Sequence, residues 1–379
     1  TGMNYSEKLT ARYLASQITK DLKKKMVFVG GPRQVGKTTV AKQLLGQNAK
    51  GYLNWDFAAH REKIINHELP VSPIWVFDEL HKYKSWRNYL KGIYDQFGSE
   101  HEILVTGSAR LDYYRHGGES LQGRYHYLRL NPLSVAELKI TTQSDFEQLL
   151  KLGGFPEPFF SSSSFESKRW SREYRHRLIE EDLVALEQVK DLSALELLML
   201  RLPNLVGSPL SINGLREDLN YSHKAVANWL SIFERLYAII RISPFGSPLL
   251  RAVKKEQKHY HYDWTLVGSK GARFENLVAM HLMKWVQFEV DVKARELELR
   301  YFRDTDSREV DFIITEDGRP ILAVECKWGD DEVSKSLKYF KQRFPDCDAW
   351  QISMVGTKDY LSRENIRVSN AINLLSGFV

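Results

Sequence analysis

The segment from Gly31 to Thr38 has the residue types that bind the phosphates of a nucleotide. It follows the pattern glycine, four residues, then glycine, lysine and threonine, which is typical of a phosphate-binding loop. The glycines let successive backbone N–H groups point at an anion placed at a helix N-terminus. In such a loop the Lys37 ammonium reaches the β- and γ-phosphates, and the Thr38 hydroxyl is a ligand of Mg²⁺. The residues predicted to contact ATP are Gly31, Pro32, Arg33, Gln34, Val35, Gly36, Lys37, Thr38 and Thr39.

Two adjacent carboxylates predict that the nucleotide is hydrolysed. Residues 73–79 form an apolar run that ends in Asp78 and Glu79. Next to a phosphate loop, Asp78 holds Mg²⁺ directly or through water, and Glu79 orients and deprotonates the attacking water. The same pattern alone is typical of any strand that enters an acidic loop, so the upstream loop decides the interpretation. The pair favours an ATPase over a small-molecule kinase.

A third apolar run, residues 102–110, ends in small polar residues and an arginine. The hydroxyl of Thr106 or Ser108 is placed to sense the γ-phosphate and to position water, and Ser108 is an equally good N-cap for a following helix. Arg110 and Arg124 are candidate arginine fingers, which stabilise charge in the transition state. A finger supplied by a neighbouring subunit would require a homo-oligomer.

The C-terminal third contains a second group of charged residues at catalytic spacing. Asp311 lies in one apolar run, and Glu325 and Lys327 lie in the next, across a turn at 316–320. Because residues two apart in a strand share a face, Glu325 and Lys327 point the same way. This arrangement resembles the core of PD-(D/E)XK nucleases, in which carboxylates bind Mg²⁺ and a lysine activates water. Glu275, in a preceding helical segment, matches the glutamate that often completes such a metal site.

Two interpretations of this second group stay open. In one, Glu275, Asp311 and Glu325 bind Mg²⁺ and the domain cleaves phosphodiester bonds. In the other, the hairpin carries an ordinary exposed ion pair, worth about 0–1 kcal/mol, and the domain only binds DNA or protein.

The elements around these residues predict an α/β fold that contains the parallel sheet of a P-loop NTPase. Residues 26–29 are apolar and partly β-branched, which is typical of a buried strand. Residues 39–45 have helical spacing, and Gly46 is placed to end that helix. The strands at 73–79 and 102–110 complete the core, so that the phosphate loop and both carboxylates lie at strand ends.

The middle of the chain predicts a helical connector and then a winged-helix segment. Residues 137–200 have a helical pattern, which is interrupted by a Gly-Gly-Phe-Pro-Glu-Pro turn at 153–158 and a serine run at 161–164. After them a helix, a short turn, a helix beginning after Ser222 and a strand at 237–242 follow in helix-turn-helix order. The second helix is predicted to bury Val226, Trp229, Leu230 and Phe233. His223, Lys224 and Asn228 then face either DNA or a partner protein.

The chain resembles a family of prokaryotic AAA-type ATPases that carry a C-terminal domain of the DUF4143 type. The resemblance covers the chain from about Tyr5 almost to its end, and rests on the strings GPRQVGKTT, VFDEL, TGSAR, LQGRYHYLRLNPLSVAEL and GGFPEP. It implies an ATPase core, a winged-helix segment and a C-terminal restriction-endonuclease-like α/β domain. The implied boundaries are 3–135 for the ATPase core, 136–195 for the helical lid, 196–250 for the winged-helix segment and 255–379 for the nuclease-like domain.

Composition is compatible with this assignment. The 379 residues are 43% hydrophobic and 27% charged, which is ordinary for globular proteins. No apolar run approaches the roughly 20 residues of a membrane span. With two cysteines and no signal peptide, we expect a cytoplasmic protein. The net charge of +6 indicates a polyanionic partner such as DNA, although the basic runs at 23–25, 169–177 and 254–258 are equally typical of solvated faces.

The sequence therefore predicts a DNA-associated, Mg²⁺-dependent ATPase whose nucleotide state controls a nuclease-like C-terminal domain. The alternative is a regulatory ATPase switch in which that domain is catalytically inactive and binds DNA or protein.

Overall fold

A computed structural model describes residues 11–107, 121–179, 192–246 and 257–379. The chain divides into two compact units, residues 1–132 and 133–379. No helix in these described ranges is both long and apolar enough to cross a membrane. Each unit has its own sheet.

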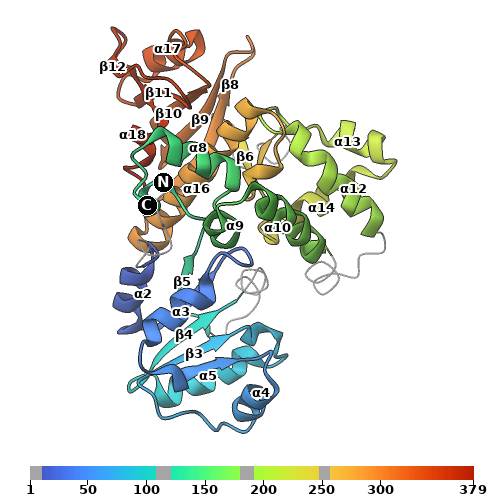
Figure 1. The fold of residues 1–379 in the computed structure, drawn as a ribbon, viewed down its shortest axis with the longest axis vertical. Helices are drawn as coiled ribbons and strands as arrows, with labels where there is room; N and C mark the ends of the chain where they lie inside the picture. The colour runs from blue at the N-terminus through green and yellow to red at the C-terminus, as the bar shows by residue number, and fades with distance from the viewer. Residues whose placement is uncertain (1–10, 108–120, 180–191, 247–256) are drawn as a thin grey trace. The chain divides into compact units, whose positions relative to one another are not determined.

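The first unit contains a parallel sheet of five strands in the order β2-β3-β4-β1-β5. Figure 1 labels β3, β4 and β5 of this sheet. All four strand pairings are parallel, so the predicted α/β sheet is confirmed. Two strands are shorter than predicted: the run at 73–79 forms its strand from Ile74 to Asp78, and the run at 102–110 ends its strand at Thr106. The strands are β1 Met26–Gly30, β2 Tyr52–Asn54, β3 Ile74–Asp78, β4 Glu102–Thr106 and β5 Tyr125–Arg129.

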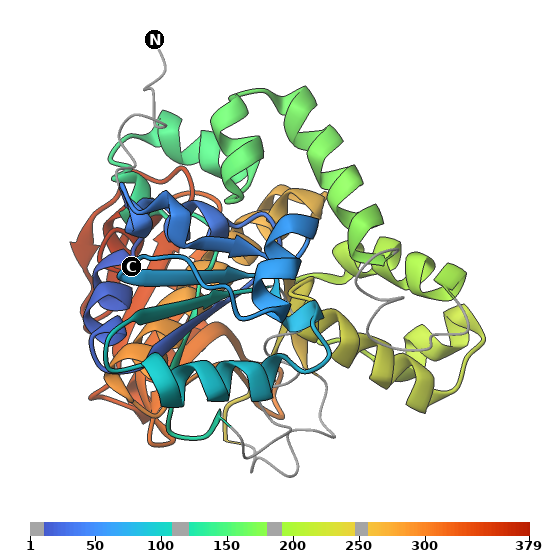
Figure 2. The ribbon, with the colours of Figure 1, turned by 90° about the horizontal axis from the view of Figure 1, so that it is seen from below.

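Helices cover both faces of this sheet, because side chains of buried parallel strands alternate between two apolar faces. Phe28, Phe77 and Val105 pack with helix α5 in one core cluster, and Figure 2 shows α5 in teal along one side of the strands. Helices α2 and α3 contact β1, β3 and β4. The helices are α2 Ala15–Leu22, α3 Lys37–Leu45, α4 Ala58–Ile65 and α5 Trp86–Phe97, with short 3₁₀ turns at Ala49–Gly51 and Leu80–Lys82. Helix α3 ends at Gly46 as predicted.

The second unit begins with short helices. They are α7 Val135–Leu138, α8 Gln143–Leu152, α9 Pro156–Ser161, α10 Ser164–Arg177 and α12 Leu192–Arg201. The turn predicted at 153–158 is confined to its first residues, because Pro156 begins α9. Proline suits the first helical position, where its missing N–H leaves no bond unmade.

The predicted order of helix, turn, helix and strand is present after α12. Helix α13 (Ile212–Leu219) is followed by α14 (His223–Arg235) and strand β6 (Ile239–Pro244). The Ser222 hydroxyl accepts a hydrogen bond from the Ala225 N–H and so caps α14. The four predicted residues of α14, Val226, Trp229, Leu230 and Phe233, are all buried, and Ile232 is buried as well. Figure 1 shows α12, α13 and α14 gathered into one helical group.

Eight strands form the second sheet, in the order β12-β13-β11-β10-β9-β8-β6-β7. Strand β6, predicted as part of the winged-helix segment, pairs with β8 and therefore belongs to this C-terminal sheet. The turn between β9 and β10 consists of Asp317 and Gly318, both with positive φ (49° and 77°), as a two-residue hairpin requires. The remaining elements are β7 Lys258–His261, α16 Lys270–Lys293, β8 Leu297–Arg303, β9 Glu309–Glu316, β10 Arg319–Lys327, α17 Lys335–Arg343, β11 Asp348–Ser353, β12 Tyr360–Leu361, β13 Arg367–Asn370 and α18 Ala371–Leu375, with 3₁₀ turns at Leu202–Leu205 and Trp264–Leu266.

Candidate nucleotide site and carboxylate cluster

The loop between β1 and α3 has the backbone geometry of an anion cradle. Gly31, Gln34 and Gly36 all have positive φ, at 133°, 59° and 102°, so the chain curls tightly before α3 begins at Lys37. A Cβ on Gly31 would lie 2.2 Å from the Leu130 carbonyl oxygen, so only glycine fits there. The loop thus presents backbone N–H groups at a helix N-terminus, where an anion is favoured.

The two functional side chains of this loop are both held. The Lys37 Nζ donates hydrogen bonds to the carbonyl oxygens of Gly31 (2.9 Å) and Pro32 (2.6 Å). The Thr38 Oγ1 donates to Asp78 Oδ2 at 2.8 Å. The structure therefore brings together the loop and the first predicted carboxylate, which are distant in sequence.

Asp78 accepts hydrogen bonds from three hydroxyl groups. Besides Thr38, the Tyr52 hydroxyl donates to Oδ2 (2.6 Å) and the Thr106 Oγ1 donates to Oδ1 (2.6 Å). Thr106 is opposite Asp78 in the register of β3 and β4, and Asp78 is only 3% exposed. Burial and then the Asp78 carboxylate raise the pKa of Tyr52 above its ordinary value, so Tyr52 stays a hydrogen-bond donor. We call Thr38, Tyr52, Asp78 and Thr106 the hydroxyl cage.

The hydroxyl cage fits a magnesium ion. Mg²⁺ prefers hard oxygen ligands and usually takes one or two carboxylates together with phosphate oxygens. Asp78 and the Thr38 hydroxyl supply such oxygens beside the phosphate loop.

The other residues predicted for catalysis are placed differently. Glu79 follows β3 with φ 57°, and its Oε2 lies 3.2 Å from Lys82 Nζ. Arg124 pairs with Asp95 at 2.8 Å on an exposed part of the first unit, so the structure does not bring it to Asp78. Ser108 and Arg110 lie outside the described residues.

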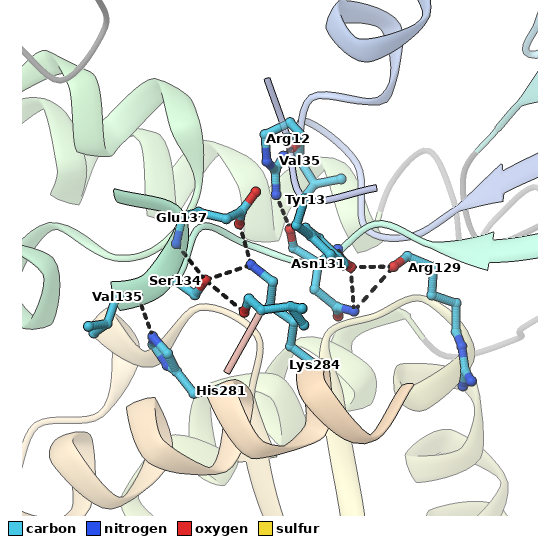
Figure 3. Close-up of polar contacts among 11 residues, drawn as sticks. Arg12, Tyr13, Val35, Arg129, Asn131, Ser134, Val135, Glu137, His281 and Lys284 are labelled. Atoms are coloured by element: carbon cyan, nitrogen blue, oxygen red, sulfur yellow. Dashed lines mark hydrogen bonds and ion pairs between the residues drawn. The ribbon is translucent and has the colours of Figure 1, made fainter. Parts of the chain in front are cut away.

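Arg12 contacts the phosphate loop from outside, and no sequence motif marks it. Its Nη1 donates to the Val35 carbonyl oxygen at 2.5 Å and its Nη2 donates to the Asn131 carbonyl oxygen (Figure 3). In a trans peptide the C=O and N–H groups point in opposite directions. A guanidinium that holds the Val35 carbonyl therefore fixes the direction of the Gly36 N–H. Arg12 is a positioning residue for the loop.

In the second unit, the structure brings Asp311 and Glu325 onto neighbouring antiparallel strands. The Cys326 N–H donates to Asp311 Oδ2 at 2.9 Å, and Lys327 Nζ lies 2.9 Å from Glu325 Oε1. The first contact joins β9 to β10 across their hairpin, and the second joins residues two apart on one face of β10. Strands β9 and β10 thus hold three of the four residues that the sequence predicted for this site.

Glu275 reaches the same region from helix α16, and a lysine joins it there. The Tyr260 hydroxyl donates to Glu275 Oε1 at 2.7 Å. Lys258 Nζ lies 2.6 Å from Glu309 Oε1, 3.3 Å from Glu275 Oε1 and 3.7 Å from Asp311 Oδ1. We call Lys258, Glu275, Glu309, Asp311 and Glu325 the carboxylate cluster.

Lys258 corrects one interpretation of the sequence. The sequence predicts that the basic run at 254–258 forms either a solvated face or a surface for a polyanion. In the structure, however, Lys258 is 0% exposed. Its ammonium faces carboxylates, because it lies in strand β7 of the C-terminal sheet. Strand β7 belongs to the eight-stranded sheet and all four of its residues are buried. This burial becomes visible only once the topology is known.

Burial governs the ionisation of this cluster. Burial and then the neighbouring Glu275 and Glu325 raise the pKa of Asp311 well above its ordinary value, and Lys258 opposes the rise. Burial lowers the pKa of Lys258, but Glu275, Asp311 and Glu309 outweigh it and the pKa lies above the ordinary lysine value. Lys258 therefore remains an ammonium ion.

The predicted magnesium site at Glu275, Asp311 and Glu325 stays a prediction, and in this structure each of these carboxylates contacts another partner. Across the described ranges, no group of three or more histidine, cysteine, aspartate or glutamate residues is arranged to hold a metal ion. Among the residues that the structure describes, the buried Glu325 Oε2 has no hydrogen-bond partner, and it is a single favourable ligand. The other carboxylates are gathered around the Lys258 ammonium.

Three family models match successive parts of the chain. Residues 23–139 match the model of an AAA domain, residues 143–273 a domain of unknown function, DUF8612, and residues 270–375 a second domain of unknown function, DUF4143. The AAA match contains the hydroxyl cage, and the DUF4143 match contains four members of the carboxylate cluster. The DUF8612 match spans the predicted helical lid and winged-helix segment. No curated protein matches the sequence.

Several solved structures are distantly similar. The RuvB Holliday junction branch migration motor of Thermotoga maritima is 15% identical, with 63% of this chain and 88% of that chain covered and a TM-score of 0.28. The Orc1 protein of Aeropyrum pernix, solved in complex with DNA, is 13% identical over 73% and 93% of the two chains with a TM-score of 0.33. AMPPCP-bound DnaA from Aquifex aeolicus is 15% identical over 58% and 86%, with a TM-score of 0.29.

Proposed function

We propose, on the premise that residues 23–139 are an AAA domain and residues 270–375 a DUF4143 domain, that this protein binds and hydrolyses ATP in its first unit. The observation that carries the proposal is the hydroxyl cage. A phosphate loop, a hydroxyl at the start of its helix and a buried aspartate on a neighbouring strand are the parts that an ATPase needs, and Thr38 hydrogen-bonds directly to Asp78.

Each residue has a defined role in this proposal. The backbone of residues 31–39 and the Lys37 ammonium bind the phosphates. When bound, Mg²⁺ would be held by Thr38 and Asp78 and would neutralise phosphate charge. Thr106 and Tyr52 orient the Asp78 carboxylate through hydrogen bonds. Glu79 accepts a proton from the attacking water, and Lys82 holds the Glu79 carboxylate at 3.2 Å.

The test replaces Lys37 with alanine. We expect Lys37→Ala to abolish ATP binding, measured with a fluorescent ATP analogue, and to abolish phosphate release. The matched control is Lys20→Ala, which removes an exposed lysine from helix α2 and should leave both unchanged. Undiminished turnover in a folded Lys37→Ala protein would refute the proposal.

DNA is the partner that we propose for the chain. Support comes from the net charge of +6 and from α14, whose first turn exposes His223 and Lys224. ATP turnover measured with and without duplex and single-stranded DNA tests this, together with a salt titration, because phosphate contacts give binding a steep salt dependence. Binding that ignores salt would point to a protein partner of α14 instead.

The DUF4143 domain has two candidate functions. The first is a Mg²⁺-dependent nuclease controlled by the nucleotide state, and the close approach of Asp311, Glu325 and Lys327 favours it. The second is a catalytically inactive domain that binds DNA or protein, and the position of Lys258 favours that one. Plasmid nicking in Mg²⁺ that Asp311→Asn removes would select the first candidate.

We retain three further proposals from the sequence. The four-part division of the chain at 3–135, 136–195, 196–250 and 255–379 stays a proposal, as does a homo-oligomer that shares an arginine finger. A cytoplasmic location is proposed from the two cysteines, Cys326 and Cys347, both of which carry free thiols.

A further inference from the structure

The carboxylate cluster already contains a cation. Lys258 Nζ lies within 3.7 Å of carboxylate oxygens from Glu309, Glu275 and Asp311. The three carboxylates come from β9 and α16, and Lys258 comes from β7, so the ammonium joins β7, β9 and α16. A buried ammonium with three carboxylate neighbours has the role that a bridging metal ion has in an acidic site: it neutralises charges that burial would otherwise make costly.

The remaining neighbours of the cluster complete this arrangement. The Tyr260 hydroxyl donates to Glu275, the Cys326 N–H donates to Asp311, and Lys327 pairs with Glu325. The Tyr301 ring lies 5.5 Å from Lys258 Nζ. With all groups ionised, four carboxylates face two lysines. Divalent ions prefer several oxygens within about 2.0–2.6 Å of one point, whereas these oxygens are arranged around Lys258.

We propose that the Lys258 ammonium takes the place of a divalent cation in the carboxylate cluster, and that the C-terminal domain is therefore a metal-independent binding domain. The proposal deepens the second candidate function of the DUF4143 domain and rests on that part of the proposed function alone. Lys258 then acts as an internal counter-ion that joins β7, β9 and α16. It follows that removing the ammonium, without altering any carboxylate, opens the cluster to a metal ion.

The experiment titrates nucleotide-free full-length protein with MnCl₂ and follows bound Mn²⁺ by electron paramagnetic resonance. We expect the wild type and the Asp311→Asn variant to bind the same amount of Mn²⁺, because the cluster of the wild type binds none. We expect Lys258→Met, which keeps the side-chain length but lacks charge, to gain Mn²⁺ binding that the double variant Lys258→Met/Asp311→Asn loses again. The double variant keeps the nucleotide site, so it separates Mn²⁺ bound at the cluster from Mn²⁺ bound elsewhere.

Two outcomes would overturn the proposal. One is wild-type Mn²⁺ binding, or plasmid nicking in Mg²⁺ or Mn²⁺, that Asp311→Asn removes. The other is a folded Lys258→Met protein that gains no Mn²⁺ binding. If Lys258→Met does not fold, the wild-type titration still tests whether the cluster binds Mn²⁺. Lys258→Arg, which preserves the charge, is expected to behave like wild type. Failure here leaves the ATPase proposal intact, because that proposal is tested separately by Lys37→Ala.

Discussion

Asp78 is buried and Asp311 is partly buried. Both lie near the end of a strand, but their partners differ. Asp78 accepts hydrogen bonds from three neutral hydroxyl groups. Asp311 lies beside an ammonium and other carboxylates, at 3.7 Å from Lys258 Nζ. Hydroxyl donors orient a carboxylate and leave its charge in place, whereas an ammonium neutralises that charge. The Asp78 carboxylate therefore keeps a charge that can bind a cation, whereas the charge of the Asp311 carboxylate is already neutralised.

The comparison shows that carboxylate spacing alone does not identify a metal site. The acidic residues of both sites have a spacing that is typical of Mg²⁺ sites. Only the partners, which come from distant parts of the chain, decide whether a cation is still required. Four experiments test this contrast.

The largest effect is expected from removing the cation of the carboxylate cluster. Lys258→Met removes a buried ammonium and leaves partly buried carboxylates without their counter-ion. Breaking a buried pair costs about 3–5 kcal/mol. We expect urea unfolding to report a loss of this size in metal-free buffer. Lys335→Met, an exposed change at the start of α17, is the control and should change little. A loss below about 1 kcal/mol would mean that Lys258 does not neutralise the cluster.

The next effect concerns catalysis at the hydroxyl cage. Asp78→Asn keeps the shape of the side chain but removes the charge that holds Mg²⁺, so we expect ATP turnover to fall roughly 100-fold or more, since a bound metal supplies several kcal/mol to the transition state. Steady-state phosphate release measures it. Glu62→Gln, at an exposed glutamate of the same unit, should turn over ATP normally. Equal turnover in Asp78→Asn would remove the functional half of the comparison.

A smaller effect, of opposite sign, is expected at Asp311. The folded-state pKa of Asp311 is raised, so its contribution to stability is fully present below the unfolded pKa and is lost as pH rises through the folded pKa. Asp311→Asn avoids that loss. We therefore expect the variant to match wild type near pH 4 and to exceed it increasingly toward pH 8, by about 1.4 kcal/mol for each unit of pKa shift. Thermal unfolding across this pH range, in nucleotide-free buffer, shows whether the difference grows with pH; a difference that shrinks contradicts the argument.

The smallest effect is expected from a single hydroxyl of the cage. Thr106→Val preserves shape but removes the hydrogen bond to Asp78 Oδ1, and a bond to a charged group contributes about 1.5–3 kcal/mol at most. Because Thr38 and Tyr52 still hold the other oxygen, we expect a several-fold decrease in turnover and a modest loss of stability. Thr19→Val, at an exposed threonine of α2, controls for the change of residue type. A collapse of turnover as large as that of Asp78→Asn would show that Thr106 has a direct catalytic role.

Local features of both sites could be predicted from the sequence. The strand before the phosphate loop, the helix after it and its end at Gly46 follow from apolar spacing and glycine chemistry. The turn at Asp317 and Gly318 follows from the residue types that positive φ demands, and it places Asp311 near Glu325. Each of these conclusions depends on neighbours in sequence.

The partners could not be predicted, because they depend on topology. Tyr52 reaches Asp78 only because β2 lies beside β3, and a tyrosine in a short strand carries no sign of that role. Lys258 stands at the end of a basic run, and its burial follows from the place of β7 in a sheet whose strands are not in sequence order. Ser108 and Arg110, which the sequence offers as candidates, lie outside the described residues.

The two hydrogen bonds of Arg12 have a practical consequence for anyone who shortens or tags this protein. Every residue of the nucleotide motif lies after position 30, so a fragment that begins at β1 would keep the whole motif. Such a fragment would nevertheless lack the guanidinium that holds the Val35 carbonyl. Its phosphate loop would be free to turn the Gly36 peptide away from the nucleotide. The boundary of a working ATPase fragment is therefore set by an arginine that no motif search would include.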